Sequence, residues 1–343
     1  MKISKLSILP IFLISLSGLL ASCGLSKGGG QELEGINFNN PIALQRADPW
    51  VYKDSDDTYY FIATVPEYDR IEIRSSKTIK GLTEAAPVVV WRKHESGPMG
   101  NHIWAPELHR IDGKWYIYFA AGSAEDKWKI RMYVLFNASD NPTEGEWVEE
   151  GQIQTLRDDF ALDATTFELE GQRYLVWAER AIPTNTGLMI AKLKNPYTLE
   201  GSEVVITEPE YEWEMQKYNV NEGPAVLIRN NKVFISYSAS ATDASYAMGL
   251  LWAEIGSDLL NPASWNKSPV PVFYTNEAFN RFGPGHNSFT IAEDGKTDVM
   301  IYHARDYKEI DGESLYDPNR HTRARVLRWT EDGMPDFSQE IDD

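Results

Sequence analysis

The feature that most constrains the fold of this chain is a unit of nearly sixty residues that recurs five times. Each unit has a short apolar strand, a turn centred on Asp, Asn or Gly, and a second strand rich in aromatic and β-branched residues. This is the pattern of a β-hairpin. The five hairpins read "DPWVYKDSDDTYYFIAT" from Asp48, "WAPELHRIDGKWYIYFAAG" from Trp104, "LDATTFELEGQRYLVWAE" from Leu162, "NEGPAVLIRNNKVFISYSAS" from Asn221 and "GHNSFTIAEDGKTDVMIYHA" from Gly285.

One position keeps its phase through the five units. It is occupied by Asp48, Ala105, Asp163, Glu222 and His286, at separations of 57, 58, 59 and 64 residues. Further strand-like segments follow the hairpins, and the links between units recur as Asn141-Pro142, Asn195-Pro196 and Asn261-Pro262. Four strands per unit and five units predict an all-β fold, a five-bladed β-propeller over residues 39–343. A β-sandwich with insertions would not produce five phased hairpins.

The phased position carries three carboxylates and one histidine. In a propeller the first strand of each blade lines the central channel, so these side chains are expected to converge at one end of it. Asp48 stands directly before a proline, and a lone Asp-Pro is usually a solvated turn. Three acidic residues meeting at a channel mouth would repel one another unless they had a task or a counter-ion. The phase therefore favours a catalytic set over a turn.

Two facing carboxylates suit the cleavage of a glycosidic bond. One stays ionised and takes a proton from water, while the other is held protonated and gives its proton to the leaving oxygen. Their environments separate the two pKa values, and a third carboxylate near the acid raises the acid's pKa by repulsion.

Composition agrees with a carbohydrate partner. The 33 basic and 51 acidic residues give a formal net charge of −18, which disfavours nucleic acid and anionic lipid as partners. The 11 Trp and 17 Tyr have flat apolar faces that suit sugar rings, although strands also recruit these residues.

The N-terminus is interpreted as a targeting segment. Lys2 and Lys5 precede an apolar run, residues 6–20, which is short for a bilayer span. The stretch "LLASCG" resembles the lipobox of bacterial lipoproteins, and Cys23 is the only cysteine of the chain. We expect a signal peptide over residues 1–22, a lipid on Cys23, a tether over residues 23–38 and a periplasmic or cell-surface location. The alternative is a plain secretory signal with an incidental cysteine.

Five short motifs together resemble glycoside hydrolase family 43. They are "RADPWV" around Asp48, "IWAPEL" around Trp104, "LDATTF" around Asp163, "NEGPAV" around Glu222 and "GHNSFT" around His286. The resemblance implies a five-bladed propeller that inverts the anomeric centre, with Asp48 as general base, Glu222 as general acid and Asp163 as the residue that positions Glu222 and modulates its pKa. It also links His286 to a calcium ion or to water in the channel, and no other cofactor is expected. A histidine satisfied by backbone is the alternative for His286.

Four further residues have weaker claims. Trp104 is a candidate for stacking on a sugar, and core packing is an equal alternative. His102 and Arg305 are candidates for hydrogen bonds to sugar hydroxyls, with structural ion pairing as the alternative for Arg305. Glu107 is expected to pair within its own blade.

The segments Ala63 to Ser76 and Gly100 to Gly122 most resemble the exo-acting α-L-arabinofuranosidases of the family. The expected substrate is therefore a terminal arabinofuranosyl residue of plant cell-wall oligosaccharide or polysaccharide. A β-xylosidase of the same family and a non-catalytic glycan-binding propeller stay as alternatives.

Overall fold

The computed structural model describes residues 38–182 and 185–343. The predicted signal peptide, Cys23 and all of the tether except Phe38 lie outside the described residues. Within them, no helix is long and apolar enough to cross a membrane. Strands dominate, and the helical segments are short 3₁₀ turns such as η2, Glu212–Glu214.

The first two repeat units each form a four-stranded antiparallel sheet. The first contains β1 (Ala47–Lys53), β2 (Tyr59–Thr64), β3 (Arg70–Ser76) and β4 (Val88–Arg92). The second contains β5 (Asn101–Ile111), β6 (Lys114–Gly122), β7 (Arg131–Asn137) and β8 (Val148–Gln152).

The next two units share one sheet. They are β9 (Ala161–Leu169), β10 (Gln172–Ile182), β11 (Asn185–Asn195) and β12 (Thr198–Thr207), then β13 (Asn219–Arg229), β14 (Lys232–Ala239), β15 (Ala247–Glu254) and β16 (Asn266–Lys267). A short parallel pairing of β11 with β13, through Asn185↔Asn219 and Thr186↔Val220, joins the two units.

The last unit departs from the expected four strands. Its sheet has three, β17 (Phe282–Ile291), β18 (Asp298–Arg305) and β19 (His321–Val326), while β20 (Arg328–Trp329) and β21 (Pro335–Asp336) pair separately. The start of the domain borders β19, because Ala43 forms a bridge with Thr322. The last sheet thus draws its next neighbour from the other end of the domain.

Local turn chemistry explains the hairpins. The β5–β6 turn uses Asp112 (φ 49°) and Gly113 (φ 74°), and the β13–β14 turn uses Asn230 (φ 50°) and Asn231 (φ 61°). Two successive positive φ angles are typical of the two-residue turn that matches strand twist, and Asn, Asp and Gly tolerate them best. The turns predicted from sequence therefore lie where the hairpins reverse.

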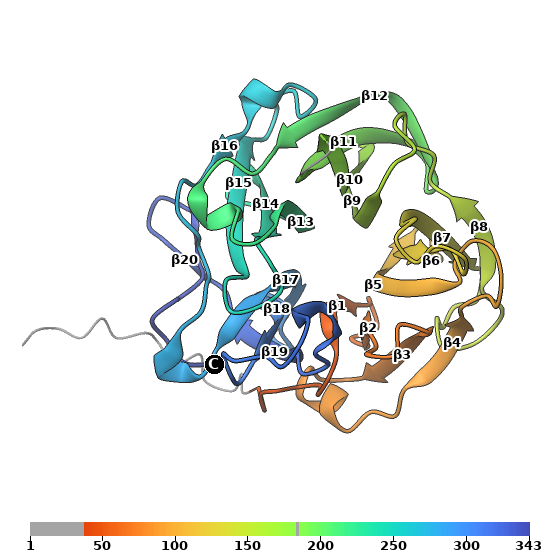
Figure 1. Ribbon diagram of the computed structural model, residues 1–343, viewed down its shortest axis with the longest axis horizontal. Helices are drawn as coiled ribbons and strands as arrows, with labels where there is room; N and C mark the ends of the chain where they lie inside the picture. Colours follow the sequence, from red (N-terminus) through yellow and green to blue (C-terminus); the bar gives the residue numbers. More distant parts are fainter. Residues whose placement is uncertain (1–37, 183–184) are drawn as a thin grey trace, which may run out of the picture. The chain divides into compact units, whose positions relative to one another are not determined.

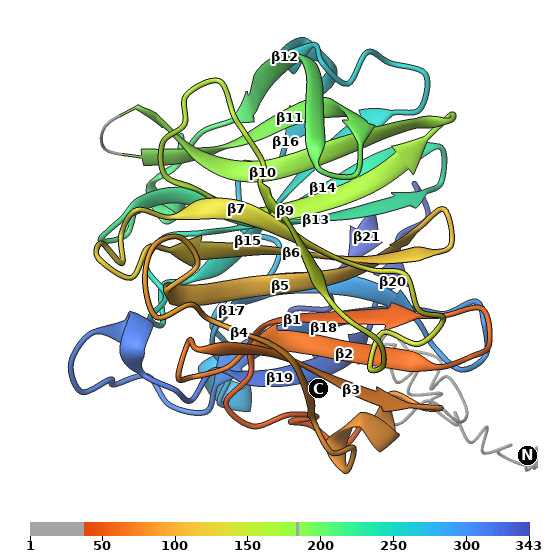
Figure 2. The ribbon, with the colours of Figure 1, turned by 90° about the vertical axis from the view of Figure 1, so that its right-hand side faces the viewer.

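The first strands of the five units contact one another in the order β1, β5, β9, β13, β17 and back to β1. Figure 1 shows these strands near the common centre, with the later strands of each unit farther out. Figure 2 views the first and second sheets from the side.

The core consists of apolar layers between successive sheets. Adjacent residues on β2 point to opposite faces, so Ile62 packs with residues of the second sheet while Phe61 packs with Ile301 of the last sheet. The same alternation divides Ile117 and Tyr118 of β6 between two clusters. Each sheet is therefore apolar on both faces, and the last layer connects the last sheet to the first.

Candidate active site

The phased position is a bulge in every central strand. The register breaks there, and the backbone is left-handed at Asp48 (φ 53°), Ala105 (44°), Asp163 (57°), Gly223 (56°) and His286 (44°). A bulge residue leaves the ladder and turns its side chain out of the pleat. In the fourth unit the left-handed residue is Gly223, so the phase found by sequence is shifted there by one residue from Glu222.

Glycine is required in two of these bulges. A Cβ on Gly223 would stand 3.0 Å from the His286 ring, and its φ is positive. A Cβ on Gly285 would stand 2.5 Å from the Tyr246 ring. These two glycines let the central strands approach closely enough for their polar side chains to meet.

Backbone N–H groups at the bulges bind the preceding unit. Asp48 N donates to His303 Nδ1 at 3.0 Å, Ala105 N to Thr64 Oγ1 at 2.7 Å, Gly223 N to Asp163 Oδ2 at 2.9 Å and His286 N to Ser238 Oγ at 2.7 Å. Each acceptor comes from the unit before the donor. The polar side chains of the centre are thus fixed by the same contacts that join the units.

A cavity of about 610 Å³ opens where the bulges meet. It is lined by Asp48, Asp163, Glu222 and His286, which the sequence placed together, and by Trp104. The remaining wall includes the exposed aromatics Trp128, Tyr218 and Tyr316 together with Phe160, Leu162 and Leu315. A polar floor under an aromatic wall is the arrangement that sugar-binding clefts use.

Asp48 lies on the cavity floor and is 8% exposed. Its Oδ2 accepts a hydrogen bond from Thr64 Oγ1 at 2.6 Å, and its Oδ1 is 3.3 Å from Arg320 Nη1. Burial alone would raise the pKa of Asp48, but His286, Arg320, His303 and the Thr64 hydrogen bond together lower that pKa to about 2. Asp48 is therefore ionised at any ordinary pH.

Arg320 was missed by sequence reasoning. It is 5% exposed and lines the cavity, and its Nη2 donates to Tyr68 Oη at 3.4 Å. It lies directly before β19, outside the repeated hairpins. The available signal was "RHTRARV", a cluster of arginines at a strand that must be buried.

Glu222 and Asp163 have the opposite electrostatics. Burial, followed by the charge of Asp48, raises the pKa of Glu222 to about 7, against a hydrogen bond from Tyr246 Oη at 2.8 Å that lowers it. Burial, followed by the charge of Glu222, raises the pKa of Asp163 well above its usual range. Near neutrality one of these neighbouring carboxyl groups is therefore protonated while Asp48 is not. Sequence reasoning did not single out Tyr246.

His286 faces Asp48 in the cavity. Its Nδ1 lies 3.3 Å from Asp48 Oδ1, and burial lowers its pKa, so the ring is neutral near pH 7. The described residues contain no group of three or more His, Cys, Asp or Glu side chains that could hold a metal ion. Calcium takes six to eight oxygen ligands. The side-chain donors of this part of the chain do not by themselves make up a calcium site.

Trp104 lines the cavity and is supported from behind by His102. The two rings stack at 4.2 Å with an interplanar angle of 17°, and His102 Nδ1 lies 3.0 Å from Lys127 O. Burial lowers the pKa of His102 to about 4. His102 is 4% exposed and is not among the lining residues, and its contact in the structure is with the Trp104 ring.

Arg305 also lies behind the cavity. Its side chain is 1% exposed, and its guanidinium donates to Asp317 Oδ1 at 3.0 Å, Thr242 O at 2.6 Å and Ser314 O at 2.7 Å. The guanidinium is committed to protein acceptors and is not among the lining residues. These contacts agree with the ion pairing that was the alternative for Arg305. The arginine of the last unit that lines the cavity is Arg320.

Glu107 pairs within its own strand, as expected. Its Oε2 lies 2.8 Å from His109 Nε2, and both side chains are buried. Burial raises the pKa of Glu107 and lowers the pKa of His109 to about 3. Burial thus disfavours the charged form of both members of the pair.

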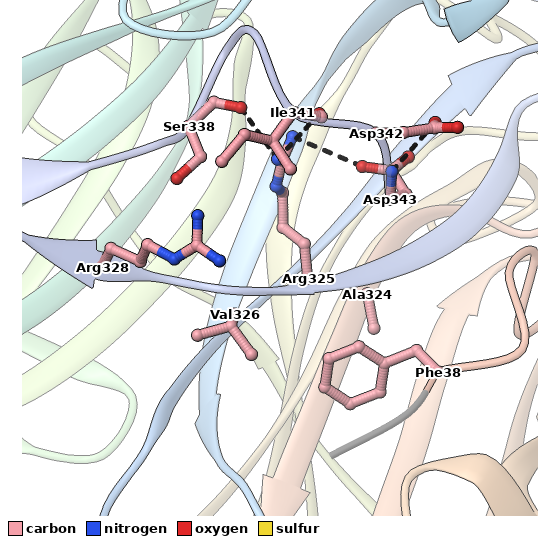
Figure 3. Close-up of a pocket in the computed structure, with 9 residues that line it drawn as sticks. All are labelled: Phe38, Ala324, Arg325, Val326, Arg328, Ser338, Ile341, Asp342 and Asp343. Carbon is pink, nitrogen blue, oxygen red and sulfur yellow. Dashed lines mark hydrogen bonds and ion pairs between the residues drawn. The ribbon is translucent and has the colours of Figure 1, made fainter. Parts of the chain in front are cut away.

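A second, smaller cavity of about 210 Å³ lies near the C-terminus (Figure 3). Arg325 points into a turn of the chain there and donates to Ser338 O at 2.8 Å and Ile341 O at 3.1 Å. None of the predicted site residues lines this cavity.

Known proteins are similar to this chain over most of its length. The pattern of the family described as "Glycosyl hydrolases family 43" matches residues 38–335. An "Extracellular exo-alpha-(1->5)-L-arabinofuranosidase" of Streptomyces avermitilis is 54% identical over 310 residues, covering 90% of this chain but 64% of that protein. The chain thus spans less than two thirds of that relative's length.

Two further proteins are similar over most of their own lengths. A protein of the same description from Streptomyces chartreusis is 53% identical over 278 residues, covering 80% of this chain and 85% of that protein. The crystal structure of an α-L-arabinofuranosidase from Lactobacillus brevis superimposes with a TM-score of 0.86 and 51% identity, covering 89% of this chain and 97% of that one.

Proposed function

The chain belongs to glycosyl hydrolase family 43, and we propose that it is an inverting, exo-acting α-L-arabinofuranosidase. The observation that carries the proposal is the division of protonation states in one cavity. Asp48 is held ionised, because its pKa is about 2, while Glu222 retains its proton as the pH rises toward its pKa of about 7. These are the states that a general base and a general acid need at working pH.

The proposed reaction follows from these states. Asp48 accepts a proton from a water molecule as the water oxygen bonds to the anomeric carbon. The bond from that carbon to the leaving oxygen breaks, and Glu222 gives its proton to that oxygen. Water enters on the face opposite the leaving group, so the anomeric configuration inverts. Asp163 positions Glu222 by fixing the next backbone N–H, that of Gly223, at 2.9 Å.

The surrounding residues hold this geometry. Arg320 and Thr64 fix the two oxygens of Asp48. Tyr246 fixes one oxygen of Glu222 and leaves the other for the substrate. Trp104 offers a ring beside the carboxylates, held by stacking on His102.

The choice of sugar rests on similarity. Relatives at 51–54% identity are named arabinofuranosidases, and two are named as exo-acting on α-1,5 linkages. By extension, the proposed substrate is a terminal arabinofuranosyl residue of plant arabinan or an arabinose-substituted polysaccharide.

We also propose that the domain is a five-bladed β-propeller. The cyclic contacts of β1, β5, β9, β13 and β17 support it, as do the core layers that include one between the last and first sheets. In this description β17–β19 make the fifth blade, and Ile42 and Ala43 extend it at its outer edge.

A lipid anchor on Cys23 is proposed from the sequence alone. Relatives are described as extracellular, and the lipobox-like "LASC" adds membrane attachment. If this is right, Cys23→Ser releases the protein from membranes or blocks its processing. A variant that fractionates and migrates like the parent would exclude acylation as the attachment.

A panel of nitrophenyl glycosides tests the activity. We expect turnover of the α-L-arabinofuranoside well above that of the β-xyloside, with the opposite anomer appearing first in the proton NMR spectrum. Preference for the β-xyloside would make the chain a xylosidase, and sugar binding without turnover would make it a glycan-binding protein.

A further inference from the structure

An open groove of about 620 Å³ lies beside the catalytic cavity. It is lined by four aromatic residues, Tyr211, Trp213, Tyr246 and Tyr274, and by two prolines, Pro269 and Pro271. Apart from Tyr246, nothing in the proposed catalytic reaction uses these residues.

The groove and the cavity share one rim, which is built from two segments. In the β14–β15 connection, Ser240 to Thr242 line the cavity while Ala244 to Ala247 line the groove. In the segment that leads into β13, Gln216 lines the groove while Tyr218 lines the cavity. A chain that leaves the cavity across this rim enters the groove directly.

Tyr246 connects the two sites most closely. Tyr246 is among the residues that line the groove, and its hydroxyl donates to Glu222 Oε1 at 2.8 Å on the cavity side. The residue is 1% exposed, and its ring stacks on His303 at 5.7 Å. This one residue therefore contacts both the groove and the proposed general acid.

The aromatic floor of the groove is held firmly. Trp213 Nε1 donates to Pro269 O at 3.1 Å, and the Trp213 ring stacks on Tyr237 with a centroid separation of 6.2 Å. The turn η2 that carries Trp213 is fixed by Glu214, which is fully buried and lies 2.8 Å from Lys267 Nζ. A platform fixed in this way loses little conformational freedom when a ligand binds.

The chemistry of the lining selects the ligand. Aromatic faces combined with hydrogen-bonding groups, the neutral Gln216, Ser245 and Thr275 and the one acidic residue Glu212, match a neutral polyhydroxylated chain. The net charge of −18 disfavours anionic ligands. Continuity with the catalytic cavity favours the same polysaccharide that the cavity cleaves.

From these observations we infer that the groove is a second carbohydrate-binding site, which holds a neutral arabinan chain whose end is in the catalytic cavity. The inference rests on the proposed function for the identity of the polysaccharide. Tyr274, at 41% exposed, offers the most accessible ring. Stacking on it would raise affinity for polymer without affecting small substrates, which do not reach past the rim.

The test uses Tyr274→Ala and Trp213→Ala, with Tyr274→Phe as the matched control that keeps the ring. Binding to linear α-1,5-arabinan is measured by retardation in native gels containing that polymer, in a Glu222→Gln background that does not digest it. We expect either alanine variant to weaken retardation by about tenfold and Tyr274→Phe to stay within about twofold.

In the catalytically active background, the alanine variants should raise KM on arabinan and leave kcat/KM on nitrophenyl arabinofuranoside unchanged. Tyr274→Ala guards against misfolding of the more buried Trp213 variant. Unchanged retardation in Tyr274→Ala, or loss of retardation in Tyr274→Phe, overturns the inference, as does displacement of arabinan by a proline-rich peptide. If the parent protein binds arabinan but does not cleave the aryl substrate, the proposed activity is overturned. The retardation of the variants in the gels then still decides whether the groove binds arabinan.

Discussion

Two buried charge clusters in this domain are balanced in opposite ways. The catalytic cavity brings three carboxyl groups, Asp48, Asp163 and Glu222, against the buried guanidinium of Arg320. Near the C-terminus, three buried arginines, Arg281, Arg323 and Arg325, surround the carboxylate of Asp343, whose side chain is 3% exposed. Tyr302 also donates its hydroxyl to that carboxylate.

The comparison shows that burial alone does not make a group reactive. Asp343 is buried among cations, at 3.0 Å from Arg323 Nη1 and 3.3 Å from Arg325 Nη1, so its negative charge is compensated. In the cavity one guanidinium serves three carboxyl groups, and it lies against Asp48. Glu222 and Asp163 therefore carry the cost of burial as raised pKa values, and a proton held in that way is available for transfer.

The largest effect is expected on turnover when Asp48, the carboxylate beside Arg320, is replaced. Asp48→Asn keeps the shape of the side chain but removes the proposed general base, so kcat on nitrophenyl arabinofuranoside should fall roughly 10³-fold. Circular dichroism should show the fold retained. Near-parental activity would mean that Asp48 is an ordinary turn residue held by Arg320.

Removing the charge of Asp343, which three arginines compensate, should instead lower the stability of the fold. Asp343→Asn leaves three guanidinium groups without their shared partner, which should lower the free energy of unfolding by about 3 kcal/mol. Urea denaturation measures this, with Asp342→Asn as the exposed neighbouring control. Turnover of the aryl substrate should be unchanged, and a variant as stable as the parent would show that the cluster does not need its charge.

Replacing Glu222, whose charge no cation among the described residues compensates directly, should raise the free energy of unfolding above neutral pH. Because the folded pKa of Glu222 is about 7 against 4.5 for an ordinary glutamate, its protonated form stabilises the fold below pH 4.5, and this contribution is lost as the pH rises through 7. Glu222→Gln should therefore be more stable than the parent by about 1–3 kcal/mol at pH 8 and equally stable at pH 4. Glu331→Gln, at an exposed site, is the control and should show no such pH dependence.

The smallest effect concerns the coupling within the cavity. In the parent, kcat/KM should fall above a pH of about 7 as Glu222 loses its proton. The causes that raise the pKa of Glu222 are burial and the charge of Asp48, while the charge of Glu222 raises the pKa of Asp163. Asp163→Asn should therefore leave this limb within about half a pH unit of its parental position. A limb that moves down by a full unit would show that Asp163 is ionised and repels Glu222.

The three cavity carboxylates could be predicted because the sequence repeats. Hydrophobic alternation and turn residues fix the phase of each hairpin, so Asp48, Asp163 and the "NEG" motif of Glu222 fall at equivalent places in successive units. The one-residue shift to Gly223 was not visible, because a bulge can be placed on either residue of "EG" without changing the strand pattern. Arg305 and Arg320 could not be told apart, since Arg305 is the last residue of one strand of the last unit and Arg320 directly precedes the next.

The sequence by itself determined the hairpins, the order of the units and the phased places of the three carboxyl groups, because these follow from local patterns of alternation and turn chemistry. The proposed roles of base and acid came from the resemblance to the family. Only the tertiary structure decided which groups lie against these carboxyl groups and compensate their charge. Arg320 reaches Asp48 across 272 residues, and Tyr246 reaches Glu222 from the neighbouring connection of the same unit. The pKa values of about 2 and about 7 depend on these contacts and on burial. Charge interactions depend on distance in space, which the linear pattern does not record.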